Sequence, residues 1–162
     1  MKVQITANGQ TIDAELTAEQ AEKLGLTEKK KTGWERAKNR EYFNIYTTGN
    51  VNDYVDDAVA DGQRYEYGNY FTDKALAEKM AKRIGLMLRM QRWADEHNEK
   101  INWDNHESYK YHLYYDYMSE GLFVSLICIT QNIGQIYFSS RELAEQAIEI
   151  FGDEIIEAYV KE

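Results

Sequence analysis

Histidines and clustered aspartates are the side chains of this chain most able to do chemistry near neutral pH. Asp104, His106 and His112 would need one further ligand to hold a metal ion, and their spacing matches no established zinc site. We therefore predict no metal site and interpret these three residues as ordinary surface side chains.

The aspartates are concentrated in the segment 51–62, and no basic residue falls between Arg40 and Arg64. A calcium-binding EF-hand loop requires carboxylates at alternate positions and a glycine at the sixth, and this segment has neither. We interpret the segment as a solvated acidic loop that faces a partner through Asp53, Asp56, Asp57 and Asp61.

Other catalytic signatures are absent from the sequence, which has no phosphate-cradling glycine-rich loop, no nucleophile elbow and no zincin pattern. The single cysteine, Cys128, lies inside the apolar run 122–129, which predicts a buried structural thiol and excludes an internal disulfide. This cysteine usage fits a reducing compartment. We therefore expect a protein that is not an enzyme and that binds no cofactor.

Length and composition are those of one globular domain with a small appendage, because 162 residues suffice to bury a core without disulfides. No apolar run approaches the ~20 residues needed to cross a bilayer, and no signal peptide is recognisable. The net charge of −9 is uneven, because residues 101–162 carry 3 positive and 11 negative side chains. Such a field favours basic protein partners, so we expect no direct contact with nucleic acid or with membranes.

Tyrosine is over-used, with 13 residues, and most of them fall on predicted strands. Aromatic side chains are favoured in sheets, where they pack and pair across strands. Two functional alternatives stay open. The tyrosines could form a protein-binding surface, or they could stack on a nucleotide whose phosphates are held by Arg36, Arg40 or Arg64.

The first 31 residues predict a small β-β-α appendage. Asn8-Gly9 between two extended segments is a strong hairpin signal. Thr17 and Gln20 have capping-box spacing and predict a short helix that stops at Gly25. We expect this appendage to occupy residues 1–31 and the main domain to occupy residues 32–162.

The main domain contains an internal repeat. Residues 70–85 and 137–152 share six of sixteen aligned positions at a constant offset of 67. Strand patterns precede each copy and a long helix follows it, which predicts two tandem β-β-β-α units at about 41–97 and 109–160. We expect an α+β fold with antiparallel sheets and long helices packed on them. The predicted strands include 64–71, a central strand at 122–130 that is apolar on both faces, and 133–138.

The first long helix, from a Thr72 cap to His97, has two apolar stripes. The stripe from Leu76 to Leu88 should pack on the sheet. The other stripe points to the opposite side and predicts a homodimer or partner contact, unless the appendage or a connector covers it. Its members are Leu86, Met90 and Trp93.

The last helix opens at Ser139 and has one clean apolar stripe, with Gly152 able to kink or split it. Its opposite face is acidic. We predict that this face binds a basic partner through Glu142, Glu145, Glu149, Asp153 and Glu157.

Three short motifs resemble small accessory proteins from phages and prophages of Gram-positive and gut bacteria: residues 31–36, residues 67–71 and residues 151–154. The resemblance runs over most of residues 31–160 and assigns no functional residue. It implies a mobile-element protein that acts in the cytoplasm of a bacterial host cell. Small acidic phage proteins of this kind often bind and block host defence machinery, as anti-CRISPR proteins do.

These observations together predict a non-enzymatic, anti-defence binding protein. Its acidic surfaces would block a basic, nucleic-acid-binding surface of a nuclease complex such as Cas9, and charge complementarity would speed association. The alternatives are a nucleotide-binding or sponge protein and a dimeric structural protein.

Overall fold

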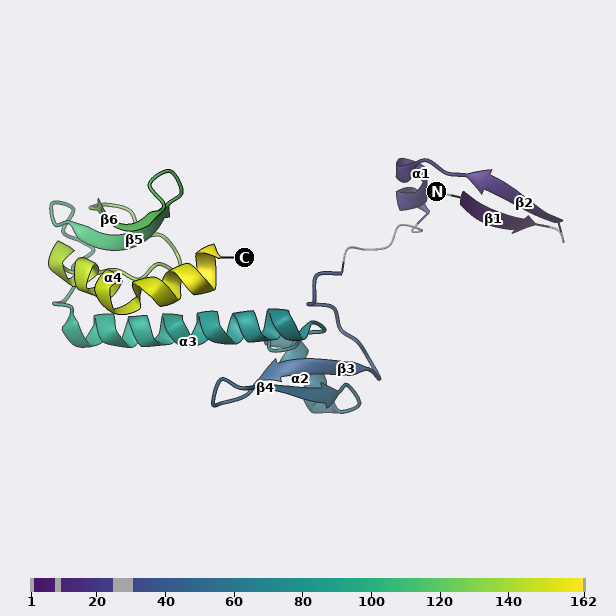
Figure 1. Ribbon diagram of the computed structural model, residues 1–162, viewed down its shortest axis with the longest axis horizontal. Coiled ribbons are helices and arrows are strands. Elements are labelled where there is room, and N and C mark those ends of the chain that lie inside the picture. Colours follow the sequence, from purple (N-terminus) through teal and green to yellow (C-terminus); the bar gives the residue numbers. More distant parts are fainter. Residues whose placement is uncertain (1, 8–9, 25–30, 162) are drawn as a thin grey trace. The chain divides into compact units, whose positions relative to one another are not determined.

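The computed structural model describes residues 2–7, 10–24 and 31–161. The chain divides into two compact units, residues 1–35 and residues 36–162, which we call unit 1 and unit 2 (Figure 1). Helices occur together with small antiparallel sheets, so the expected α+β class is confirmed.

Unit 1 is an antiparallel hairpin followed by a short helix. Strand β1 (Lys2–Ala7) pairs with β2 (Gln10–Glu15), and helix α1 spans Ala18–Lys23. The predicted capping box is confirmed, because the Gln20 backbone N–H donates to Thr17 Oγ1 and the Thr17 backbone N–H donates to Gln20 Oε1. The turn predicted at Asn8-Gly9 and the stop predicted at Gly25 lie outside the described residues.

Unit 2 begins with a second hairpin, in which β3 (Glu41–Ile45) pairs with β4 (Val51–Val55). The predicted acidic loop at 51–62 is wrong, because β4 and the start of α2 (Val59–Glu66) occupy it. The strand predicted at 64–71 is also wrong, and of that segment Phe71 alone forms a β-bridge, to Phe43.

Asp61 explains why a helix forms where a strand was expected. Its carboxylate accepts hydrogen bonds from the backbone N–H groups of Asp57 and Ala58, so it satisfies donors that the start of α2 would otherwise leave unpaired. A strand was predicted at 64–71, but this local cap favours a helix.

The long helix α3 (Lys74–His97) joins the two halves of unit 2 (Figure 1). Its N-cap is Asp73 rather than the predicted Thr72, since the Asp73 carboxylate accepts from the backbone N–H groups of Ala75 and Leu76. The helix contacts β3 and β4 at its N-terminal end and α4 further along.

The second half of unit 2 is a hairpin covered by a helix. Strand β5 (Lys110–Asp116) pairs with β6 (Gly121–Ile127), and helix α4 (Arg141–Ile155) continues as a π-helix, η1 (Ile156–Val160). Figure 1 shows α4 running alongside α3 in the opposite direction.

One strand predicted in this half is present but not central in its sheet, and another is wrong. The central strand expected at 122–130 is β6, which in the described part of the chain pairs with β5 alone. The strand expected at 133–138 is reduced to one bridge, between Phe138 and Tyr111. A continuous apolar run looks the same whether a further strand or a helix and loops cover it, so the sequence pattern could not separate these cases.

The core of unit 2 lies where α3, α4 and the β5–β6 hairpin meet. The apolar stripe predicted for the last helix is confirmed as part of it, and α4 continues through Gly152 without a break. The buried members are Leu86, Ala94, Phe138, Ala144, Ala147, Phe151 and Ala158.

The predicted partner stripe on α3 belongs to this core instead. Leu86 is fully buried, Met90 and Trp93 pack against the cluster, and the Trp93 ring meets Phe151 edge-on with centroids 6.3 Å apart. The stripe expected to face the sheet is divided. Ala77, in its first half, is fully buried and α3 contacts β3 and β4, whereas Met87 and Leu88 in its second half are 42% and 60% exposed. Helical periodicity finds both stripes, but the docking of α4 decides which of them is buried in the second half of α3.

Candidate functional site

The acidic face predicted for the last helix is exposed along its whole length. Four of its residues recur at three- and four-residue spacing and so form one line along α4, opposite the buried side that contains Ala144 and Phe151. We call these four residues the acidic stripe: Glu142, Glu145, Glu149 and Asp153.

Basic side chains neutralise carboxylates mainly on the flank of α4 that faces α3. Glu154 accepts from Arg89 Nη1 at 3.0 Å, and the exposed Glu157 accepts from Lys82 Nζ at 3.1 Å. Within the stripe, Glu145 pairs with Arg141 at 3.5 Å, whereas Glu149 and Asp153 form no ion pair with any residue that the structure describes. The stripe therefore keeps a net negative charge.

The aspartates predicted to join this surface are of two kinds. Asp53 and Asp57 are exposed, whereas Asp56 and Asp61 are only 4% and 3% exposed. The prediction that Asp56 and Asp61 face a partner is therefore wrong. A buried carboxylate costs free energy unless it is paired and hydrogen-bonded, and both of these are satisfied inside unit 2.

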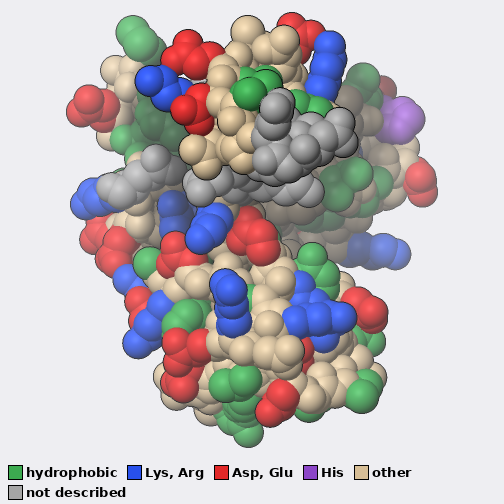
Figure 2. Space-filling model, turned by 90° about the vertical axis from the view of Figure 1, so that its right-hand side faces the viewer, with side chains coloured by type: hydrophobic (Ala, Val, Ile, Leu, Met, Phe, Trp, Pro, Cys, Tyr) green, Lys and Arg blue, Asp and Glu red, His purple; other side chains and the backbone are tan. Residues whose placement is uncertain are grey.

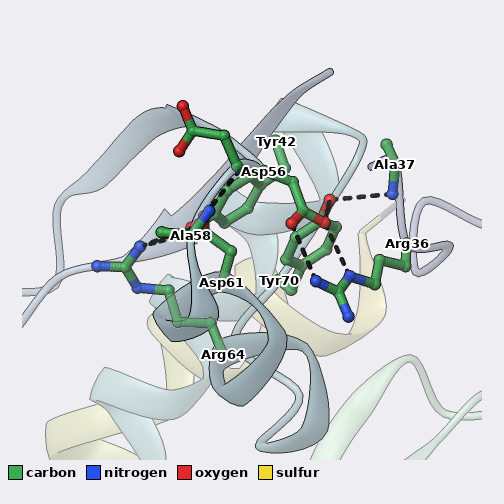
Figure 3. Close-up of polar contacts among 9 residues, drawn as sticks. Arg36, Ala37, Tyr42, Asp56, Ala58, Asp61, Arg64 and Tyr70 are labelled. Carbon is green, nitrogen blue, oxygen red and sulfur yellow. Dashed lines mark hydrogen bonds and ion pairs between the residues drawn. The ribbon is translucent and has the colours of Figure 1, made fainter. Parts of the chain in front are cut away.

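Asp56 is held by Arg36 and Tyr70 (Figure 3). Arg36 donates from Nε to Asp56 Oδ2 at 2.8 Å and from Nη2 to Oδ1 at 3.0 Å, which is a bidentate pair. The Tyr70 hydroxyl donates to Asp56 Oδ2 at 3.1 Å and accepts from the Ala37 backbone N–H at 2.9 Å. These contacts fix the segment that leads into β3 against the end of β4.

Asp61 organises the other half of the same cluster. The Tyr42 hydroxyl donates to Asp61 Oδ1 at 2.6 Å and accepts from Arg64 Nη1 at 2.6 Å. Arg64 Nη1 also donates to Asp61 Oδ1 at 2.8 Å. The side chains of Arg36 and Arg64 are 31% and 33% exposed, whereas the other four residues are buried. We call the six residues of both halves the buried polar cluster, after its buried carboxylates and tyrosines: Arg36, Tyr42, Asp56, Asp61, Arg64 and Tyr70.

Pairing and burial shift pKa values in this cluster in opposite directions. The hydrogen bond from Arg36 lowers the pKa of Asp56, and the hydrogen bond from Tyr42 lowers the pKa of Asp61. Burial raises the pKa of Tyr42 to about 12 and also raises the pKa of Tyr70. Both aspartates are therefore charged and both tyrosines neutral at pH 7, which is the state that the hydrogen-bond directions require.

The arginines of the buried polar cluster have carboxylate partners inside unit 2. Arg36 and Arg64, two of the three arginines considered for holding a phosphate, already donate to Asp56 and Asp61. The third, Arg40, is exposed, and it meets Asp56 through its backbone carbonyl. The cluster therefore acts as a structural anchor that holds α2 and the segment before β3 on the β3–β4 hairpin.

The second half of unit 2 buries a lysine that the sequence did not single out. Lys110 is 1% exposed, and its ammonium donates to the carbonyl oxygens of Asn105, Ser108 and Cys128 at 2.6, 2.8 and 3.1 Å. It also lies 5.5 Å from the centroid of the Trp103 ring. A lysine at the start of a strand is usually exposed, so no sequence pattern marks this contact, which ties the connector after α3 to the end of β6.

His112 lies on β5, two residues beyond Lys110. Its ring packs edge-on against Tyr137 with centroids 5.8 Å apart, and its Nδ1 is buried with no hydrogen-bond partner in the described structure. Burial lowers the pKa of His112. Among the residues described, no group of three or more His, Cys, Asp or Glu side chains could hold a metal ion, so Asp104 and His106 do not join His112 in such a site.

The tyrosines divide between packing and exposure. Tyr42, Tyr70 and Tyr137 are buried, which agrees with the expected packing role, whereas Tyr67 and Tyr117 are 89% and 75% exposed.

Figure 2 shows that acidic and basic side chains are interspersed over the face it presents. No helix in the described ranges has the length and apolar character needed to cross a membrane.

No protein-family model, curated protein or solved structure matches this chain. A functional proposal therefore has to rest on the geometry and chemistry of the chain itself.

Proposed function

We propose that this chain is a non-enzymatic binding protein that docks the acidic stripe of α4 on a basic surface of a protein partner. One observation carries the proposal: four carboxylates form one solvent-facing line, and among the described residues the ion pairs from α3 to α4 and η1 go to Glu154 and Glu157 on the neighbouring flank. Such a surface attracts a basic partner over a distance and selects against acidic ones.

The packing of α4 against the core of unit 2 makes the acidic stripe suitable as a binding surface. The opposite side of α4 is packed into the core through Ala144, Ala147 and Phe151, so the helix is held in place before any partner arrives. A preformed helix spares the partner complex the cost of ordering a flexible segment.

The spacing of the stripe indicates the class of surface that it fits. Side chains three and four residues apart on a helix are about 5–6 Å from one another, so the stripe presents negative charges in a row, as a nucleic-acid strand does. Together with the resemblance to phage accessory proteins, this favours the nucleic-acid-binding surface of a defence nuclease such as Cas9, met in the cytoplasm of a bacterial host.

We also propose that the two halves of unit 2 descend from one repeated unit. The helix caps Asp73 and Ser140 lie at the repeat offset, and Phe71 and Phe138 each bridge back to the first strand of their own half. Helix α2 has no helical counterpart in the second half. The acidic stripe then belongs to the second copy, in which the repeated helix acquired carboxylates.

The experiment is a DNA-cleavage and DNA-binding assay with purified Cas9–guide complex. Wild-type protein should compete with target DNA, and raising the salt concentration should weaken that competition. The double variant E149Q/D153N removes two of the three stripe charges that form no ion pair with a described residue, and it should lose most of the inhibition.

A matched control is E154Q/E157Q, which changes the net charge by the same amount on the flank that faces α3. This control should retain inhibition. The proposal that Cas9 is the target is wrong if wild-type protein leaves DNA binding and cleavage by the Cas9–guide complex unchanged. The wider proposal is wrong if the tagged protein also recovers no basic nucleic-acid-binding protein from cells that carry defence systems.

A further inference from the structure

An apolar groove opens beside the core of unit 2, between α3, the β5–β6 hairpin and η1. Its volume is about 320 Å³, near the lower end of the ~300–1,000 Å³ found for small-molecule sites. Its lining includes Met87 and Met90 of α3, Leu122 of β6 and Ile155 of α4. Methionine side chains adapt to irregular apolar ligands, so these walls suit a flexible aliphatic chain.

A guanidinium group, that of Arg83, lies against the ring of Tyr159, which is a lining residue of this groove in η1. Arg83 lies four residues before Met87 and seven before Met90, so the three side chains share one face of α3. Arg83 Nε donates to the Ala158 carbonyl oxygen at 2.7 Å, and the guanidinium lies 4.8 Å from the centroid of the Tyr159 ring. Tyr159 lines the groove and Arg83 does not, so these contacts hold the positive charge next to a wall of the groove.

Arg83 has no carboxylate partner among the described residues, although its neighbours on α3 do. Lys82 pairs with Glu157 and Arg89 pairs with Glu154, whereas no described Asp or Glu forms an ion pair with Arg83. Its hydrogen bond to Ala158 uses Nε, which leaves both Nη groups as donors for a planar anion. The π-helical turn that supplies Ala158 is a geometry often found at functional sites.

We propose that this groove binds a small aliphatic carboxylate. The chain lies against Met87, Met90 and Leu122, and the carboxylate accepts charge-assisted hydrogen bonds from the Nη groups of Arg83. The acidic stripe contributes no residue to this groove, so the inference is independent of the proposed partner binding.

The probe is sodium octanoate, with 1-octanol as the uncharged probe of equal chain length. Full-length protein labelled with ¹³C at the methionine methyl groups reports the site directly, because Met87 and Met90 line the groove whereas the 93%-exposed Met118 does not. Octanoate should shift the Met87 and Met90 signals in a saturable manner and leave the Met118 signal in place. Octanol should bind about tenfold more weakly, the loss expected for one charge-assisted hydrogen-bond pair.

Variants of α3 separate the contribution of the apolar groove walls to binding from that of the Arg83 charge. Arg83→Gln should reduce octanoate affinity to the level of octanol and leave octanol affinity unchanged, and Arg83→Lys should keep part of the preference. Arg92→Gln, at an exposed position of the same helix, is the matched control and should bind as wild type. The proposal is overturned if octanoate causes no saturable shift of Met87 and Met90, if Met118 shifts in parallel, or if Arg83→Gln binds octanoate as well as wild type does.

Discussion

The rings of Tyr42 and Tyr70 lie face to face, with their centroids 4.0 Å apart and their planes inclined by 5°. Each hydroxyl donates to a different buried carboxylate, Tyr42 to Asp61 and Tyr70 to Asp56. The stacked pair therefore joins the two halves of the buried polar cluster, and through it links β3 to α2 and to the segment before α3.

Replacing Tyr42 by phenylalanine should destabilise unit 2 by about 1–3 kcal/mol, because Asp61 and Arg64 lose a shared partner in a buried place. The ring stacking is retained, so the loss reports the hydroxyl alone. The free energy of urea unfolding measures it. Tyr46→Phe, at a 52%-exposed position of the same chain, should change that free energy by less than about 0.5 kcal/mol. Equal effects of the two substitutions would contradict the assigned role of the cluster.

Acid should weaken the cluster through its carboxylates. The folded-state pKa of Asp56 lies below its ordinary value of 3.8, so the unfolded chain takes up this proton first as the pH falls. The stability that Asp56 contributes is present above about pH 4 and is lost as the pH falls through the folded-state pKa.

Unfolding midpoints measured between about pH 6 and pH 2 test this acid dependence. Asp56→Asn should start from a lower stability and should lose less of it on acidification than wild type does. The exposed Asp53→Asn variant should follow the wild-type curve. If the Asp56→Asn variant loses stability on acidification as steeply as wild type does, the acid dependence does not come from Asp56.

The protonation of His112 should change the stability of unit 2 at a higher pH than the protonation of Asp56 does. Burial holds its folded-state pKa below the ordinary value of 6.5, so unit 2 is most stable while this imidazole is neutral. The stability that the neutral His112 side chain contributes is fully present above about pH 6.5. It declines below that pH, because the unfolded state then binds a proton more readily than the folded state does. His112→Gln should flatten the stability curve between about pH 6.5 and pH 5, whereas His106→Gln, at an exposed position, should leave its slope unaltered.

Leu86→Ala should cost about 2–5 kcal/mol of unfolding free energy, because it opens a cavity in the core between α3 and α4. Leu88→Ala, two residues away and 60% exposed, should have little effect on unfolding. Neither variant should change the mass measured by light scattering. A fall in mass for Leu86→Ala alone, with folding intact, would restore the predicted dimer contact.

Local features of this fold could be predicted where one short segment supplies its own hydrogen bonds or periodicity. The Thr17 and Gln20 capping box, the β1–β2 hairpin and the apolar stripe of α4 are all of this kind. In the candidate site, the exposure of Glu142, Glu145, Glu149 and Asp153 could be predicted because they lie opposite that stripe.

Predictions failed where the outcome depended on residues distant in sequence. Asp56 looks like a surface carboxylate until Arg36, twenty residues earlier, is placed against it. Arg83 lies next to a groove only because η1, some 75 residues later, brings Ala158 and Tyr159 to it.

The sequence by itself determined the class of elements, the acidic last third and the carboxylate line of the last helix, because charge and 3.6-residue periodicity are local properties of the chain. The tertiary structure alone decided which stripe of α3 is core, which aspartates are buried and where an apolar groove meets an arginine. These outcomes depend on how α4 docks against α3 and on which partners satisfy a buried charge, and neither is encoded within a single segment.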